Sequence, residues 1–221
     1  MILEGKVIDF LGDSITEGVG VEDRQNNRFD KRIERDCALK ASYNYGIGGT
    51  RLAHQIHASV EKPRWDLCFC GRAYDLNKSA DIIVVFGGTN DYGHGDAPFG
   101  TLEDTTPTTY CGAVYWLMSF LKTTYPSAQV VFMTPARRKG DAEKSKNAKK
   151  QPDALPLIEY VKAIEEQGKK LNVPVLNLFE NLGIDPNNEE ERHAYTIDGL
   201  HFNDAGHAII AEKLTAFLKA L

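Results

Sequence analysis

The sequence of 221 residues predicts an α/β protein in which a parallel sheet lies between two layers of helices, a three-layer α/β/α architecture. Two observations lead to this prediction. Segments with strand character alternate along the chain with segments of helical length and period, and Asp81 to Phe86 is almost continuously apolar. A continuous apolar run is typical of a strand covered on both faces, and the alternation implies parallel strands joined by crossover helices.

Five segments are expected to form the sheet. Three have strong strand patterns, residues 6–11, 81–86 and 129–133, and two are weaker, residues 41–45 and 173–179. In open parallel sheets the ligand sites lie beyond the carboxyl ends of the strands. The loops that follow these segments are therefore where we look for chemistry.

Helices are expected between the strands. The clearest pattern belongs to the last of them, in which apolar residues from Ala208 to Leu218 recur at intervals of three and four and so share one face. The helical segments are residues 27–39, 51–62, 107–124, 153–171 and 204–220. No internal repeat and no Gly/Ser or Pro linker divides the chain, so residues 1–221 are expected to form a single domain.

Composition excludes several classes of function. The chain has 26 Lys and Arg against 31 Asp and Glu, a net charge of -5, which argues against a dedicated nucleic-acid binder. No apolar run approaches the roughly 18 to 20 residues that a membrane span needs. Residues 1–6 lack the pattern of a signal peptide, so a cytoplasmic location is expected.

The four cysteines, Cys37, Cys68, Cys70 and Cys111, are interpreted as reduced thiols in a chain without an export signal. Cys68 and Cys70 are too close in sequence for the usual zinc pair, and no second Cys or His pair follows them. No metal is predicted.

One segment is unusually basic. Residues 137–150 hold seven basic and two acidic side chains, a local charge of +5, directly after the fourth strand. Such a loop either attracts an anionic substrate to the edge of the sheet or is only a solvated loop, and the second interpretation is favoured.

A candidate nucleophile follows the first strand. Ser14 stands in Gly12-Asp13-Ser14-Ile15-Thr16-Glu17-Gly18, where glycine allows a tight turn that presents the hydroxyl at the carboxyl edge. Gly-Asp-Ser is also common turn chemistry, which is the structural alternative.

Two further loops contain candidate donors of hydrogen bonds. Asn44 to Gly49 is glycine-rich and follows the second strand, but its G-x-G-G pattern is not the G-x-G-x-x-G of a dinucleotide loop. Asn90 follows the third strand, where its amide can face developing negative charge. A helix cap or an Asx-turn is the alternative role for Asn90.

A candidate base precedes the last predicted helix. Asp198 stands three residues ahead of His201, so the carboxylate can accept from one ring nitrogen and leave the other to act as base. The alternative is that His201 packs at the helix entrance. Asn203 or Asp204 is then expected to cap the helix, a role compatible with catalysis.

These four blocks, in this order and over essentially the whole chain, resemble the SGNH (GDSL-type) hydrolase family. The resemblance implies a flavodoxin-like sheet of five parallel strands and a cofactor-free serine hydrolase with Ser14 as nucleophile, His201 as base and Asp198 orienting it. It also implies an oxyanion hole from the Ser14 and Gly49 backbone N–H groups and the Asn90 side chain, with Gly48 as a competitor to Gly49.

Two departures from the family pattern stand out. Phe202 occupies the position after the histidine where the family often has proline, which affects the expected wall of the leaving-group pocket. The interval from Gly49 to Asn90 is long, and its segment 63–70 is expected either to form a wall of the site or to be a buried connection.

The chemistry of these residues predicts acyl transfer to water from a small-molecule ester. Small acyl groups such as acetyl esters, with acetylated sugars as one class, are the first hypothesis. A thioesterase or lysophospholipase is the second, and it would need an apolar tunnel, for which the available aromatics are Trp65, Phe69, Phe99 and Trp116. The third is a flavodoxin-like binding module without turnover that binds a nucleotide through residues 46–49.

Overall fold

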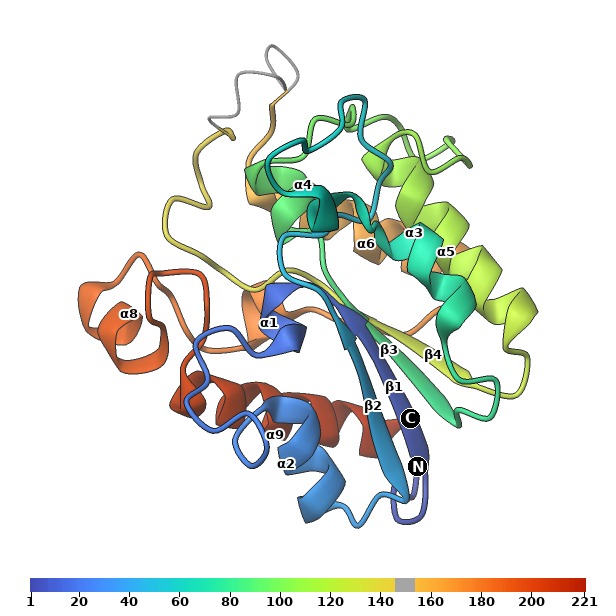
Figure 1. Ribbon diagram of the computed structural model, residues 1–221, viewed down its shortest axis with the longest axis vertical. Helices are drawn as coiled ribbons and strands as arrows, with labels where there is room; N and C mark the ends of the chain where they lie inside the picture. Colours follow the sequence, from blue (N-terminus) through green and yellow to red (C-terminus); the bar gives the residue numbers. More distant parts are fainter. Residues whose placement is uncertain (146–153) are drawn as a thin grey trace.

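The computed structural model describes residues 1–145 and 154–221 and has the predicted architecture (Figure 1). All five strands are parallel, and their order across the sheet is β2-β1-β3-β4-β5. The strands are β1 (Val7–Gly12), β2 (Ala41–Gly46), β3 (Ile82–Phe86), β4 (Gln129–Met133) and β5 (Val175–Leu176). The predicted fold class and sheet are therefore confirmed.

Helices cover both faces of the sheet (Figure 1). One layer consists of α2 (Phe29–Asp36) and α9 (Asp204–Ala220), and the other contains α3 (Phe69–Arg72), α5 (Tyr110–Thr124) and α6 (Leu157–Leu171). The shorter helices are α1 (Ser14–Glu17), α4 (Thr89–Gly93), α7 (Leu178–Asn181), α8 (Glu189–Tyr195) and the 3₁₀ helices η1 (Pro63–Asp66) and η2 (Ala73–Asp75). Within the described ranges, no helix is both long and apolar enough to cross a membrane.

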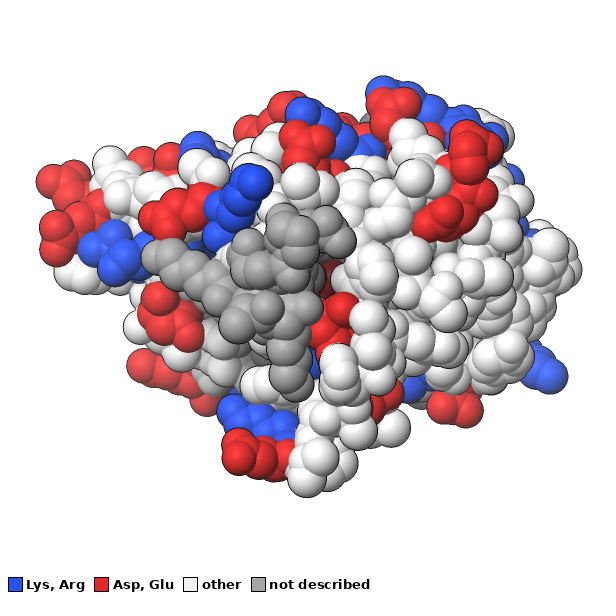
Figure 2. All heavy atoms as spheres, turned by 90° about the horizontal axis from the view of Figure 1, so that it is seen from above, with Lys and Arg blue, Asp and Glu red and all other residues white. Residues whose placement is uncertain are grey.

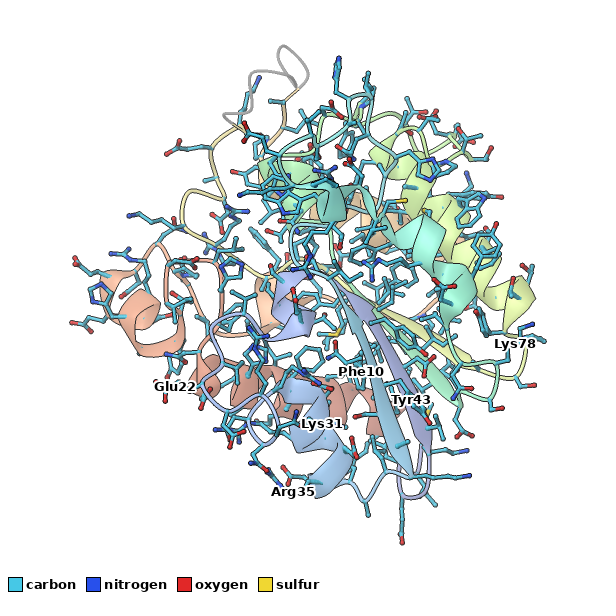
Figure 3. All side chains as sticks on the ribbon, in the orientation of Figure 1. Phe10, Glu22, Lys31, Arg35, Tyr43 and Lys78 are labelled. Carbon is cyan, nitrogen blue, oxygen red and sulfur yellow. The ribbon has the colours of Figure 1, made fainter. Side chains whose placement is uncertain are left out.

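Side chains that alternate along β1 fill two separate apolar clusters. Phe10 points into the layer of α2 and α9, where its ring meets that of Phe29 at 5.4 Å between centroids (Figure 3). Leu11 belongs to the cluster under α3, α5 and α6. Both faces of β1 are thus buried, which anchors the loop that follows it.

The prediction of a helix at residues 51–62 is wrong. These residues form bends and turns, because carboxylates from later in the chain take their backbone N–H groups. Asp91 accepts from Leu52 and Ala53 at 2.9 and 3.1 Å, and Asp96 accepts from the next N–H groups along, those of residues 56 and 57. Long-range hydrogen bonds therefore replace the helical ones that the apolar period suggested.

The weaker expected strand at residues 173–179 is much shorter in the structure. Only Val175 and Leu176 join the sheet, and Asn177 then begins α7 by accepting a hydrogen bond from the Glu180 N–H at 3.0 Å. The last predicted helix, residues 204–220, is confirmed at both ends, with Asn203 as its N-cap. The other predicted helices begin between two and four residues later than expected, and the one over 27–39 also ends three residues earlier.

The strands end level at the edge where chemistry was expected. Gly12 is in register with Gly46 on one side and with Phe86 on the other, and Met133 is in register with Leu176. The loops after β1, β2 and β3 therefore converge. Figure 2 looks onto this end of the molecule, where acidic and basic side chains of the described residues are interspersed around the margin.

Candidate active site

Ser14 is the first residue of α1, directly beyond β1. The turn brings Thr16 so close to Gly12 that a Cβ on Gly12 would lie 1.9 Å from Thr16 Oγ1. Only glycine therefore fits at this position. Asp13 caps the helix by accepting the Ile15 N–H at 3.0 Å. The turn presents the Ser14 hydroxyl at the carboxyl edge of the sheet.

Ser14, His201 and Asp198 form a hydrogen-bonded series. His201 Nε2 lies 2.9 Å from Ser14 Oγ, and His201 Nδ1 lies 2.6 Å from Asp198 Oδ2. Because an ionised carboxylate can only accept, Nδ1 carries the proton and Nε2 is left to accept from the serine hydroxyl. This arrangement aims a base at the serine oxygen.

Asp198 is held by the backbone of its own loop. Its Oδ1 accepts the N–H groups of His201 at 2.7 Å and Leu200 at 2.9 Å. Partial burial would raise the pKa of Asp198, but these bonds and the one from the imidazole outweigh it and lower the pKa below its usual value. The carboxylate thus stays ionised beside the ring that it orients.

Three N–H donors follow the ends of β1, β2 and β3, which lie in register. Among the residues that the structure describes, we find no acceptor for the backbone N–H of Ser14 or of Gly49. Asn90 gives one amide hydrogen to the Thr50 carbonyl at 3.0 Å, which fixes the side chain and leaves the second hydrogen for a ligand. The Gly48 N–H, by contrast, donates to Glu17 Oε2 at 2.6 Å.

The 3₁₀ helix η1 places Trp65 against Gly49. A Cβ on Gly49, whose φ is +78°, would lie 1.9 Å from Trp65 Nε1. The indole also stacks on His94 at 4.2 Å between ring centroids, and Lys62 Nζ lies 4.4 Å from its centroid. Beside it is a hollow of about 430 Å³ lined by Arg51, Ala58, Ser59, Val60, Glu61, Lys62, Trp65 and His94.

Comparison with known proteins identifies the family of the chain. Residues 10–209 match the model of the GDSL-like Lipase/Acylhydrolase family. The chain belongs to this family. Of the GDSL-like chain's structural neighbours, a protein from Lactobacillus plantarum is 30% identical, with 98% of both chains covered and a TM-score of 0.83. No curated protein matches the chain.

Two more distant structures share the fold of this GDSL-like acylhydrolase. The lipase/acylhydrolase from Enterococcus faecalis is 19% identical, with a TM-score of 0.60. The aligned part covers 97% of this chain and 96% of the Enterococcus chain. A two-domain esterase active on acetylated mannans is 20% identical, with a TM-score of 0.62. The aligned part covers 99% of this chain and 50% of the esterase chain.

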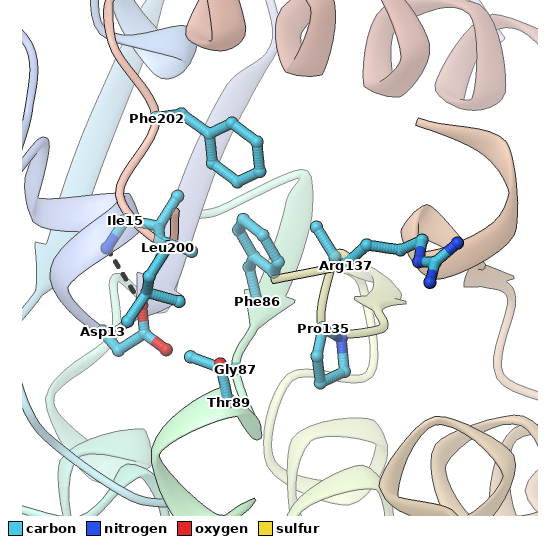
Figure 4. A pocket seen from close by; sticks show the side chains of 10 residues that line it. Asp13, Ile15, Phe86, Gly87, Thr89, Pro135, Arg137, Leu200 and Phe202 are labelled. Carbon is cyan, nitrogen blue, oxygen red and sulfur yellow. Dashed lines mark hydrogen bonds between the residues drawn. The ribbon is translucent and has the colours of Figure 1, made fainter. Parts of the chain in front are cut away.

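A small space lies beside Asp13 and Ile15, the residues on either side of Ser14 in this GDSL-like acylhydrolase (Figure 4). It is too narrow for a water molecule, and its walls are Asp13, Ile15, Phe86, Gly87, Thr89, Pro135, Ala136, Arg137, Leu200 and Phe202. Phe202, expected at a leaving-group pocket, is instead a buried core residue here. Burial in this region raises the pKa of Asp13 to about 6, against the lowering effect of the Ile15 N–H.

The buried Arg72 ties the loops of the GDSL-like site together. Its guanidinium donates to the carbonyls of Gly12 and Tyr45, at the ends of β1 and β2, and to Thr50 Oγ1. Nε donates to the Leu67 carbonyl at 2.8 Å. Nothing in the local sequence marks Arg72 for this role, because Gly12, Tyr45 and Thr50 are distant along the chain.

The basic segment 137–150 lies partly outside the described residues, since 146–150 are not among them. Arg137 pairs with Asp141 at 3.1 Å and Asp185 at 2.8 Å. Arg138 donates to the carbonyl and hydroxyl of Thr89, and burial lowers its pKa. Two of the basic side chains are therefore engaged in contacts within the protein.

The long interval between Gly49 and Asn90 contains both a residue beside the site and a buried connection, the two alternatives expected for its segment 63–70. Trp65 forms a wall against Gly49, whereas Phe69 and Cys70 are buried in the core under α5. Sequence reasoning missed Glu17 and Arg64, which pair at 3.0 Å. An acidic residue three positions after a candidate nucleophile is the only local signal for the first of them.

Proposed function

We propose that this acylhydrolase cleaves small carboxylic esters through an acyl-enzyme on Ser14. The observation that supports this most is the series Ser14 Oγ, His201 Nε2, His201 Nδ1 and Asp198 Oδ2, with separations of 2.9 and 2.6 Å at its two hydrogen bonds. A serine hydroxyl is a poor nucleophile at neutral pH and needs an adjacent base. His201 is placed to be that base.

The reaction has two halves. His201 Nε2 takes the hydroxyl proton as Ser14 Oγ attacks the ester carbonyl, and then returns that proton to the departing alkoxide, which leaves as the alcohol. A water molecule next gives a proton to Nε2 and attacks the acyl-enzyme, and Nε2 passes that proton to Ser14 Oγ as its bond to the acyl group breaks and the acid is released. Asp198 keeps the imidazole in the required tautomer throughout.

The tetrahedral intermediate of each half carries a negative oxygen. The N–H groups of Ser14 and Gly49 and the Asn90 amide are proposed to bind it, because they follow three strands that end in register and because the described residues do not take all of their hydrogens. Donors fixed in advance stabilise the anionic oxygen more than the neutral carbonyl. That difference lowers the activation free energy for forming and for hydrolysing the acyl-enzyme.

Small acyl groups suit the surroundings of Ser14. The space lined by Asp13 and Ile15 is too narrow for a water molecule, and of the four aromatics considered for an acyl tunnel only Trp65 lies against Gly49. Phe69 is fully buried, Phe99 packs on Tyr110 and Trp116 stacks on Phe120. These contacts do not build a tunnel among the described residues, which favours acetyl over long acyl esters.

The alcohol part of the substrate is proposed to be polar. The hollow beside Gly49 carries the hydrogen-bonding side chains of Ser59, Glu61 and Lys62. Such a lining suits a hydroxyl-rich alcohol, as in an acetylated sugar, better than an alkyl chain. A nucleotide-binding role for residues 46–49 is disfavoured, because the Glu17 carboxylate occupies the Gly48 N–H and would repel a phosphate.

The test is hydrolysis of p-nitrophenyl esters of increasing acyl length by the wild type and Ser14→Ala. We expect acetate to be the best substrate and Ser14→Ala to lower kcat by roughly 10³-fold or more with an unchanged unfolding midpoint. Equal turnover by a pure Ser14→Ala preparation would contradict the assignment. A rise in kcat/KM toward octanoate would favour the long-chain alternative instead.

A further inference from the structure

An N–H donor in an oxyanion hole must itself be held in place, and in this protein one side chain is suited to hold it. We propose that Glu17 is a positioning residue: its carboxylate fixes the Gly48 N–H and thereby orients the neighbouring Gly49 N–H toward the oxygen that becomes negative. This inference rests on the proposed function, because it assigns a task to Glu17 within that reaction.

The contact is short and links two functional segments. Glu17 Oε2 accepts the Gly48 N–H at 2.6 Å. A hydrogen bond to an ionised acceptor is stronger than one between neutral groups. Because Glu17 stands one helical turn after Ser14 on α1, the carboxylate fixes the glycine loop relative to the nucleophile itself.

The glycine loop and α1 leave no room for alternative positions. A Cβ on Gly48 would lie 2.8 Å from Glu17 Oε2 and 3.5 Å from Ser14 Cβ, and a Cβ on Gly46 would lie 2.2 Å from the Glu17 backbone nitrogen. Asn44 adds a second tie by donating to the Thr16 carbonyl at 2.8 Å. The backbone of the loop therefore runs directly over α1.

The other oxygen of Glu17 is also engaged. Oε1 accepts from Arg64 Nη2 at 3.0 Å, and the next residue, Trp65, covers Gly49. Arg64 is more than half exposed, so the ion pair itself adds little stability. Its effect is to aim the carboxylate and to offset a negative charge that would otherwise oppose the oxyanion.

Three substitutions separate the effect of the Gly48 hydrogen bond from those of the Glu17 charge and of the ion pair with Arg64. Glu17→Ala removes both contacts, Glu17→Gln keeps an oxygen that can accept from Gly48 but loses the charge, and Arg64→Ala removes only the ion pair. Glu22→Ala is the matched control, because Glu22 is exposed and lies away from α1 (Figure 3).

We expect Glu17→Ala to lower kcat for p-nitrophenyl acetate by about 10- to 100-fold with little change in KM, since a small misplacement of a catalytic donor has this effect. Inhibition by an arylboronic acid, which forms a tetrahedral adduct on serine, should weaken by a similar factor. Glu17→Gln should recover most of both losses, and Glu22→Ala should behave as wild type. Arg64→Ala should lower kcat and the affinity for the boronic acid less than Glu17→Ala does.

Hydrogen exchange of the Gly48 amide, followed by NMR, tests the contact independently of turnover. Protection should be present in the wild type and Glu17→Gln and absent in Glu17→Ala. Lost protection with unchanged kcat and unchanged boronate affinity would overturn the positioning role, and so would a Glu17→Gln variant as impaired as Glu17→Ala. If the wild type shows no Ser14-dependent hydrolysis, the proposed function fails, while unprotected Gly48 in the wild type refutes the Glu17 contact on its own.

Discussion

Asn90 contributes to both structure and the proposed chemistry, and the two contributions can be measured separately. One amide hydrogen is bound to the Thr50 carbonyl at 3.0 Å, and none of the described residues accepts the other. We expect Asn90→Ala to lower kcat by about 10²- to 10³-fold, as for other single oxyanion donors, with a small change in KM. Measuring kcat and KM on one preparation checks this.

Asn188→Ala is a suitable control for Asn90→Ala. Asn188 caps α8 through bonds to the N–H groups of Glu190 and Glu191, so its loss should cost about 1 kcal/mol of stability and leave kcat unchanged. If Asn90→Ala showed the same pattern, a loss of stability with normal kcat, Asn90 would be only a structural residue.

Sequence was sufficient to propose Ser14, Asp198 and His201 as a set because each signal is local. A serine between glycines after a strand and an Asp three residues before a His are visible within a few positions. Glu17 and Trp65 could not be assigned in this way. Their roles depend on the meeting of α1, η1 and the loop after β2, which are brought together only by tertiary folding.

At the scale of elements, Arg72 links α3 to the ends of β1 and β2. We expect Arg72→Met to lower the free energy of unfolding by about 3 kcal/mol, because the carbonyls of Gly12 and Tyr45 and the Thr50 hydroxyl would each lose the charged donor. Urea unfolding monitored by circular dichroism measures the change. Burial also lowers the pKa of Arg72 to about 10, yet the group remains charged at neutral pH.

Arg35→Met is the comparison for Arg72→Met. Arg35 lies on the outer side of α2 and pairs with Asp36 in an exposed position (Figure 3). Its replacement should change stability by no more than about 0.5 kcal/mol. Equal losses in the two variants would show that the contacts of Arg72 are not specific.

Elements that pack by their own apolar pattern were predicted well, and elements governed by distant polar groups were not. The strands β1, β3 and β4 and the helix α9 follow from burial patterns within the segment. Residues 51–62 have an apolar spacing that suggests a helix, but Asp91 and Asp96 bind their N–H groups. No pattern within the segment itself reveals those carboxylates.

For the whole molecule, buried ionisable groups determine how stability changes with pH. Burial lowers the pKa of His207 to about 3 from its usual 6.5, so below pH 6.5 the unfolded chain binds a proton that the folded protein does not. Stability therefore falls as the pH falls. Asp9 and Asp13 act in the opposite direction, since burial raises the pKa of each to about 6 and the folded protein retains their protons between pH 4 and 6.

His207→Asn isolates the first of these effects. An asparagine oxygen can still accept from the Phe29 N–H, which donates to His207 Nδ1 at 3.2 Å. Between pH 6.5 and 4.5 we expect the wild type to lose about 2 kcal/mol of stability relative to the variant. Urea midpoints across this range measure the difference, and parallel curves for the two proteins would refute the assignment.

The level carboxyl ends of the strands have a consequence for how such a protein can diversify in evolution. Because Gly12, Gly46 and Phe86 end in register, the loops that follow them meet without any change to the strands below. Between β2 and β3, residues 54–66 with η1 lie outside both apolar clusters, so changes there can reshape the walls around Ser14 while the clusters beneath stay the same. Substitutions in this loop can therefore change which esters fit the site while the free energy of unfolding stays nearly the same.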